Sequence, residues 1–194
     1  MLDTITVTKR NGRIEPLDIS KIQKHTHAAV EGLEGVSQSE LEVDAKILFK
    51  DKITTEEIQQ TLIKTAVDKI DVDTPNWTFV AARLFLYDLY HKVTGWTGYK
   101  KLEDYFIQGE KEGKLICGIK EKYDLAFLDS HIKPERDLQF NYLGIKTLYD
   151  RYLLKDANNH PIELPQHMFM AIAMFLAQNE TDCNAWAVKF YDMI

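Results

Sequence analysis

The segment VTKRNGRIEPLDISKI, residues 7–22, decides how the first part of this chain folds. Apolar and polar residues alternate from Thr4, and Asn11-Gly12 is the dipeptide best suited to the positive φ angles of a tight hairpin turn. A second strand is expected over about residues 13–17. Two isolated strands are only marginally stable in water, so we expect this hairpin to pack against other elements.

Four helices are predicted to follow the hairpin. Asp18 is placed to cap the first helix, and Gly32 ends it. The second is expected over residues 37–50. The third begins with TTEE, residues 54–57, in which the Thr54 hydroxyl and the Glu57 carboxylate form a capping box. Pro75 opens the fourth, which runs toward Val93. The first part is therefore predicted to be mainly α, with a β-hairpin capping a four-helix bundle.

The second part of the chain is expected to form further helices with a small hairpin. Gly95 and Gly98 mark a boundary, which predicts domains at residues 1–95 and 96–194. The predicted elements are helices at 99–112, 140–150 and 185–194, a hairpin joining 152–154 to 162–164, and an apolar helix opened by Pro165. The last helix has no glycine, proline or polar stop, so we expect this chain to be cut from a longer one.

Composition excludes several classes of protein. The formal net charge of −6 argues against a polyanion such as nucleic acid as a partner for the whole surface. The longest apolar run, residues 168–177, is half the roughly 20 residues that a membrane helix needs, and the opening segment is not a signal peptide. Cys117 and Cys183 form no CxxC pair, and no histidine cluster has metal-ligand spacing. We expect a cytoplasmic protein with reduced thiols, without a metal site.

Basic residues around the predicted turn suggest an anion site. Lys9, Arg10 and Lys21 would face one spot if the hairpin folds onto the start of the first helix, whose free amides favour phosphates. The alternative is that all three are ordinary solvated charges, and spacing alone does not decide between the two. The chain has neither a P-loop motif nor a Rossmann glycine motif, so a nucleotide site here would be of another kind.

Two further residues have both a functional and a structural interpretation. The Thr55 hydroxyl would bond to a base or phosphate, or it would take part in capping the third helix with Thr54. His91, near the end of the fourth helix, would meet a phosphate or would be a histidine without a ligand. No arrangement of serine, histidine and acid has a recognisable catalytic motif, so no catalytic residue is predicted.

Several segments of the sequence resemble a known family of proteins. The segment 7–22 resembles the opening of the ATP-cone, the activity-control domain of many ribonucleotide reductase large subunits. The resemblance continues through ITTEEIQQTLIKTAVDKI (53–70) and AARLFLYDLYHKV (81–93). In the second part, RDLQFNYLGIKTLYDRYLL (136–154) and ELPQHMFMAIAMFLA (163–177) look like the start of the helical region of the same subunit's catalytic domain.

The resemblance implies a nucleotide site in the first part. In that family the cone binds ATP as activator and dATP as inhibitor, with Mg²⁺ expected on the phosphates. The match assigns to the site Lys9, Arg10, Glu15, Pro16, Leu17, Asp18, Ile19, Ser20, Lys21, Ile22, Thr55, Gln59 and His91. Family members often have lysine at the position of His91. Phosphate binding here would therefore weaken between about pH 6 and 8, as the imidazole loses its proton.

The same resemblance implies an enzyme for the parent chain. That enzyme would be a ribonucleoside-diphosphate reductase, working with a radical-generating beta subunit and forming homo-oligomers. Neither Cys117 nor Cys183 lies in a family catalytic motif, so this chain alone is expected to be inactive. Two alternatives stay open: a nucleotide-responsive transcriptional regulator that uses the same cone, and a helical interaction module without a ligand.

Overall fold

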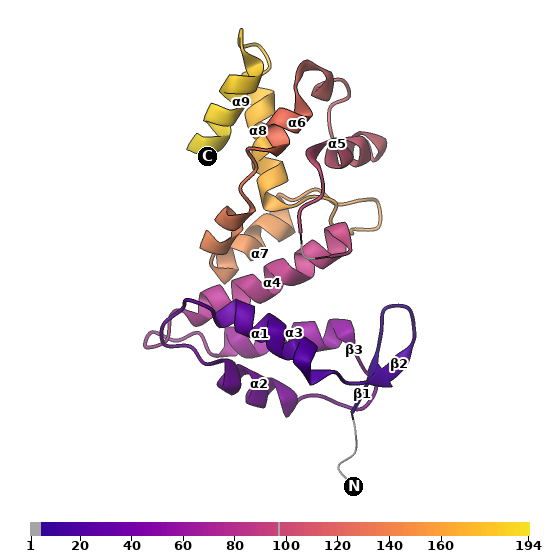
Figure 1. Ribbon diagram of the computed structural model, residues 1–194, viewed down its shortest axis with the longest axis vertical. Helices are drawn as coiled ribbons and strands as arrows, with labels where there is room; N and C mark the ends of the chain where they lie inside the picture. The colour runs from indigo at the N-terminus through magenta and orange to yellow at the C-terminus, as the bar shows by residue number, and fades with distance from the viewer. Residues whose placement is uncertain (1–4, 97) are drawn as a thin grey trace. The chain divides into compact units, whose positions relative to one another are not determined.

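The computed structural model describes residues 5–96 and 98–194, which divide into two compact units (Figure 1). The first unit comprises the described residues up to Asp88 together with Phe140–Lys146, and the second comprises Leu89–Gln139 with Thr147–Ile194. Thr4, where the predicted alternation begins, lies outside the described residues. The predicted domains, 1–95 and 96–194, stay a prediction. The division between the two units falls after Asp88, inside helix α4 (Trp77–Thr94).

The first unit contains a small sheet and helices in the predicted order. Its elements are β1 (Thr6–Thr8), β2 (Ile14–Pro16), α1 (Ile19–Val30), α2 (Gln38–Lys46), β3 (Ile53–Thr54), α3 (Thr55–Asp68), the beginning of α4 and the beginning of α7 (Tyr142–Arg151). The predicted hairpin of β1 and β2 is confirmed, and a third strand extends it, giving the order β2-β1-β3. β3 runs parallel to β1. A strand of two residues shows no alternation, so the sequence could not predict it.

Capping fixes where α1 and α3 begin. The Asp18 carboxylate accepts a hydrogen bond from the Ser20 amide at 3.0 Å, as expected for the first helix. At α3, the Thr54 amide donates to the Glu57 carboxylate at 2.8 Å, and the Glu57 amide donates to the Thr54 hydroxyl at 3.1 Å. These reciprocal bonds confirm the predicted capping box.

α2 ends at Lys46, four residues earlier than the sequence predicted. The chain leaves the helix because the following loop is bonded to β1. Asp51 accepts from both the amide and the hydroxyl of Thr6, at 3.0 and 2.6 Å, and the Thr8 hydroxyl donates to the Lys52 carbonyl at 3.0 Å. These contacts draw the loop out of helical geometry and bring Ile53 beside Val7.

The core of the first unit lies between the sheet and the helices. Apolar residues recur at helical spacing on each helix and lose almost all contact with solvent. The buried set includes Val7, Ile53, Leu41, Ala45, Leu62, Ala66, Trp77, Val80, Ala81 and Leu84. Burial of these side chains is the main force that holds the short strands in place, since three strands of two or three residues contribute few hydrogen bonds.

The second unit is helical. Its elements are the end of α4, α5 (Leu102–Lys111), η1 (Lys120–Lys122), α6 (Leu125–Asp129), η2 (Pro134–Gln139), the end of α7 (Tyr142–Arg151), α8 (Pro165–Ala177) and α9 (Cys183–Met193). Pro165 opens α8 as predicted. The predicted small hairpin is reduced to one bridge, Lys155 with Pro161, because a turn built on Asp156 takes up the residues between.

A buried polar network joins the helices of the second unit. Asp137 is fully buried and accepts hydrogen bonds from Tyr90 (2.7 Å), Tyr99 (2.5 Å) and the Gln166 amide group (2.7 Å). Burial raises the pKa of Asp137, and the three hydrogen bonds act in the opposite direction. The Gln166 carbonyl in turn accepts from the Tyr191 hydroxyl at 2.6 Å, so the network runs from α4 to α9.

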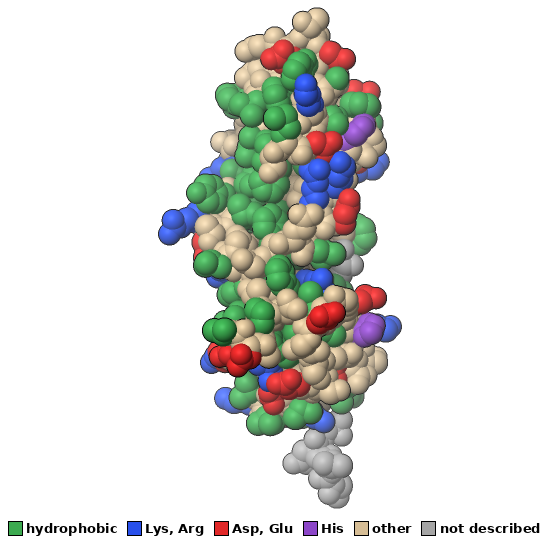
Figure 2. Space-filling view, turned by 90° about the vertical axis from the view of Figure 1, so that its left-hand side faces the viewer, with side chains coloured by type: hydrophobic (Ala, Val, Ile, Leu, Met, Phe, Trp, Pro, Cys, Tyr) green, Lys and Arg blue, Asp and Glu red, His purple; other side chains and the backbone are tan. Residues whose placement is uncertain are grey.

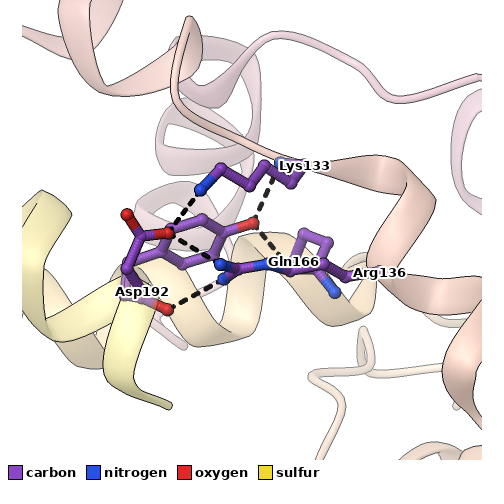
Figure 3. Close-up of polar contacts among 5 residues, drawn as sticks. Lys133, Arg136, Gln166 and Asp192 are labelled. Atoms are coloured by element: carbon purple, nitrogen blue, oxygen red, sulfur yellow. Dashed lines mark hydrogen bonds and ion pairs between the residues drawn. The ribbon is translucent and has the colours of Figure 1, made fainter.

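The outer end of this network holds α9 through charged groups (Figure 3). The Tyr191 hydroxyl accepts from the Lys133 amide at 2.9 Å. The Asp192 carboxylate accepts from the Lys133 ammonium at 2.6 Å and from the Arg136 guanidinium at 2.7 Å. Lys133 and Arg136 thus fix the last turn of α9 against the segment that carries η2.

Hydrophobic side chains also reach the surface of the second unit, and Figure 2 shows them gathered on one face in its upper part. On α8, Ile172, Phe175 and Leu176 are each between 43% and 55% exposed, and Met193 at the end of α9 is 74% exposed. Single exposed apolar residues are ordinary, but a group on packed helices is typical of surfaces that contact other parts of a protein.

Glu163, just before α8, is an ionisable group in the core of the second unit. Its carboxylate is 2% exposed, and it accepts hydrogen bonds from the Tyr105 hydroxyl and from the Leu154 amide. Burial raises its pKa to about 7, although both hydrogen bonds favour the charged form. The folded chain therefore holds this proton more tightly than the unfolded chain does, and stability contributed by Glu163 is lost as pH rises through 7.

The variant Glu163→Gln tests this assignment. It should match the parent chain in stability near pH 5 and exceed it at pH 8 by up to about 3 kcal/mol, the penalty for ionising the buried group. Urea unfolding at both pH values measures the difference. Comparison with the parent cancels the opposing titration of His167, whose pKa burial lowers to about 3. A difference independent of pH would contradict the assignment.

Candidate nucleotide-binding site

The hairpin turn presents the first two basic residues. The Lys9 amide donates to the Arg13 carbonyl and the Gly12 amide to the Lys9 carbonyl, both at 2.8 Å. Gly12 has φ of +78°, a conformation that side chains disfavour, which explains the glycine at this position, while the Asn11 side chain accepts a hydrogen bond from the Arg13 amide at 3.1 Å. Lys9 and Arg10 therefore lie together at the start of the turn.

Lys9 is held by a carboxylate on the neighbouring strand. Its ammonium group is 2.9 Å from Glu15, and the Lys9 side chain is 27% exposed. This hydrogen bond from Lys9 is the main reason why the pKa of Glu15 is lowered. A phosphate group that reaches Lys9 would meet an ammonium that already has one negative partner, so Glu15 sets how strongly Lys9 attracts anions.

The start of α1 also carries its own negative charge. Asp18 accepts from the amide and the hydroxyl of Ser20, and these bonds lower its pKa. The Lys21 ammonium lies 3.8 Å from the same carboxylate. The Asp18 carboxylate thus lies at the helix start where the sequence predicted a phosphate. The Lys21 ammonium partly neutralises the negative charge of that carboxylate.

Strand pairing brings the start of α3 to the same end of the sheet. Thr8 pairs with Thr54 in the parallel ladder, so the next residues, Lys9 and Thr55, leave β1 and β3 in the same direction. Thr54 makes the capping bonds, and among the described residues the Thr55 hydroxyl makes no hydrogen bond. The structural interpretation of Thr55 as a cap is therefore wrong, and its hydroxyl is left for another partner.

The remaining predicted residues have varied surroundings. Gln59 donates to the Leu84 carbonyl of α4 at 2.8 Å, which commits its amide group to the bundle. Leu17 and Ile22 are half-buried, whereas Pro16 and Ile19 are exposed. His91 lies in the part of α4 that belongs to the second unit, and its role at this site stays a prediction.

Sequence reasoning missed Asp88, a buried carboxylate near Arg10. Asp88 is 3% exposed, and its carboxylate lies 3.7 Å from the Arg10 guanidinium. Gln60 donates to the other carboxylate oxygen at 3.4 Å. Asp88 is the only acidic residue in the α4 sequence, which is otherwise largely apolar, and that isolation was the one available signal. The contact ties the hairpin turn to α4.

Metal-ligand clusters and membrane-spanning helices are both absent from the described part of the chain. Among residues 5–96 and 98–194, no three histidine, cysteine, aspartate or glutamate side chains are grouped as metal ligands. No helix in those ranges combines the length and the apolar character needed to cross a membrane.

Two family models match segments of this chain. The family model of the ATP cone domain matches residues 5–92, which include the hairpin, α1 to α3 and most of α4. The model of the all-alpha domain of ribonucleotide reductase matches residues 138–194. The chain belongs to the ribonucleotide reductase alpha-subunit family.

Relatives named as alpha subunits of ribonucleoside-diphosphate reductase support this membership. The alpha subunit of ribonucleoside-diphosphate reductase from Helicobacter pylori strain J99 is 75% identical over 98% of this chain. The subunits from Enterobacteria phage T4 and from Escherichia coli K12 are 34% and 32% identical over its whole length. This chain spans only 24–26% of the length of these ribonucleotide reductase subunits.

Two adjacent threonines of this ATP cone give a test of the geometry. Thr54→Ala should lower the free energy of unfolding by about 1 kcal/mol, because the bonds of the Thr54 hydroxyl with the amide and the carboxylate of Glu57 are lost. Thr55→Ala should change it by less than about 0.5 kcal/mol, since no bond within the fold is removed. Urea unfolding of the two variants measures both values, and an equal loss in each would show that the Thr55 hydroxyl is structural.

Proposed function

We propose that residues 5–92 bind an adenine nucleotide, ATP or dATP, at the end of the sheet where Lys9 and Thr55 emerge side by side. The observation that carries the proposal is the parallel register of Thr8 with Thr54, within a segment that matches the ATP cone domain. It supplies a cation and an uncommitted hydroxyl within one small region, which is what a phosphate chain and a ribose or base require.

The other predicted residues would complete this site. Arg10 and Lys21 add positive charge, and each already faces a carboxylate, Asp88 and Asp18 respectively. Triphosphate carries enough negative charge to compete with single carboxylates for these cations. Mg²⁺ would arrive with the nucleotide, since it prefers phosphate oxygens and water to an all-protein cage. His91 would contact phosphate from α4.

We further propose that this site controls an enzyme. The longer protein would be a ribonucleoside-diphosphate reductase that makes deoxyribonucleotides for DNA synthesis in the cytoplasm, with a beta subunit as its radical-generating partner. ATP would activate and dATP inhibit by favouring different arrangements of homo-oligomer and beta subunit. Such control requires each nucleotide to bind the two arrangements with different affinity. The match of residues 138–194 to a reductase domain favours this over a transcriptional regulator.

Calorimetric titration of the 194-residue chain with ATP and dATP at fixed Mg²⁺ tests the nucleotide site. Both nucleotides should bind in competition with one another. Lys9→Ala should weaken both by at least about tenfold, because a charged hydrogen bond is lost. Thr55→Ala should weaken binding without loss of stability. Lys46→Ala, at an exposed lysine of α2, serves as the control and should bind like the parent.

Two results would count against the proposal. If neither nucleotide binds and neither raises the melting temperature, the chain is a helical module without this ligand, because any ligand of the native state must stabilise it. If both bind but Lys9→Ala and Thr55→Ala have no effect, the nucleotide lies elsewhere on the chain.

A further inference from the structure

A cleft opens on the first unit, between the loop that joins α2 to β3 and the outer face of α3. Its volume is about 430 Å³, within the range of sites for small molecules. Its walls include Leu48, Ile53 and Thr61 together with three lysines. None of the thirteen residues predicted for the nucleotide site lines it. The cleft is therefore separate from the site proposed above.

The three lysines are Lys50, Lys52 and Lys64, and all are exposed. Within residues 5–96 and 98–194, none of their ammonium groups makes an ion pair. Lys69, the residue that caps the end of α3, shows the contrast, since its ammonium group lies 2.6 Å from the carboxylates of both Glu40 and Asp44. The cleft thus gathers cations that the fold does not neutralise by direct pairing.

Two carboxylates also line the cleft, and each accepts hydrogen bonds from uncharged groups and is attracted by one of the lysines, Asp51 by Lys52 and Glu57 by Lys50. Asp51 accepts from the amide and hydroxyl of Thr6, and Glu57 accepts from the amide and hydroxyl of Thr54. Each carboxylate therefore has a structural task, in tying the loop to β1 or capping α3. Three lysines against two such carboxylates leave the cleft with a positive balance.

The backbone at Lys52 adds an independent observation. Lys52 has φ of +61°, in the left-handed region that lysine rarely adopts and that glycine adopts freely. The Thr8 hydroxyl holds this conformation by donating to the Lys52 carbonyl. A side chain that lines a cleft from a strained backbone position is often there for binding rather than for stability.

We propose that this cleft binds the phosphate group of a small anionic ligand, with Lys50, Lys52 and Lys64 as its cations and Leu48 and Ile53 as an apolar wall for the rest of the molecule. The site stands independently of the nucleotide site. Its loop is bonded through Asp51 and Lys52 to Thr6 and Thr8 of β1, the strand that leads directly into Lys9. Occupancy of the cleft would therefore stiffen the strand on which the hairpin is built.

Backbone amide NMR spectra of the chain tell the two sites apart. Inorganic pyrophosphate is titrated into the Lys9→Ala variant, so that the hairpin no longer competes. Saturable shifts should appear at residues 50–53 and 60–64, and they should weaken as salt concentration rises. A parallel titration with ADP shows whether the apolar wall adds affinity for a nucleoside. Shifts confined to the hairpin, or spread weakly over all surface lysines, would overturn the proposal.

Two triple variants that lose the same charge, one inside the cleft and one outside it, give a second test of the site. Replacing Lys50, Lys52 and Lys64 with glutamine should weaken pyrophosphate binding about tenfold or more, since each exposed cation contributes a modest amount. The control replaces three exposed lysines outside the cleft, Lys46, Lys111 and Lys114, and removes the same net charge. If pyrophosphate binding weakened equally in both variants, the loss would come from the change in net charge alone, and the proposed site would be contradicted.

Lys52→Gly separates binding from folding. Glycine relieves the left-handed backbone and removes the cation, so the melting temperature should stay the same or rise while pyrophosphate binding weakens. Lys52→Asn, a residue that tolerates this conformation, should behave in the same way. A loss of stability with unchanged binding in both variants would assign Lys52 a purely structural role and overturn its part in the site.

Discussion

The pairing of β1 with β3 is the contact on which the first unit depends. Only two residues of each strand face each other, Val7 with Ile53 and Thr8 with Thr54. Side chains reinforce so short a ladder: Asp51 binds the amide and hydroxyl of Thr6, and the Thr8 hydroxyl binds the Lys52 carbonyl. Burial of Val7 and Ile53 holds the pair against the helices. The hairpin turn and the start of α3 meet because of this register.

The charges around that register are balanced rather than uniformly basic. Lys9 faces Glu15, Lys21 faces Asp18, and Arg10 faces the buried Asp88. An anion must compete with each carboxylate, so binding would rearrange three ion pairs at once. Arg10 matters most for such a rearrangement, because Asp88 belongs to α4 and is almost inaccessible to water. Small differences between two nucleotides would then reach a helix of the bundle.

Local signals in the sequence were sufficient for much of this fold. Asn11-Gly12 predicted the hairpin, Asp18 the start of α1, and the Thr54 to Glu57 capping box the start of α3, since each depends on neighbouring residues alone. β3 and the early end of α2 were missed because both arise from contacts with β1, 44 or 45 residues away. The same reason hid the Asp137 network and the buried Glu163, whose partners come from distant helices.

The candidate site was predictable in composition but not in arrangement. Motif recognition gave Lys9, Lys21 and Thr55, and the strand register explains why residues 46 positions apart would act together. It did not give Asp88, whose importance comes from its burial beside Arg10. The sequence predicted both an Asp18 cap and a phosphate at the start of α1, because a capping residue and an anion site have the same local sequence, and the structure shows the Asp18 carboxylate in that place.

A crystal structure of the 194-residue chain with ATP and Mg²⁺ would show directly whether the end of the β1–β3 pair binds the nucleotide. We expect the triphosphate to lie at the end of the β1–β3 pair, with the Lys9 ammonium bonded to a phosphate oxygen and the Thr55 hydroxyl bonded to the same nucleotide. The Lys9 to Glu15 contact should lengthen or break. A nucleotide bound without contact to either residue, with the Thr8 to Thr54 register unchanged, would contradict it.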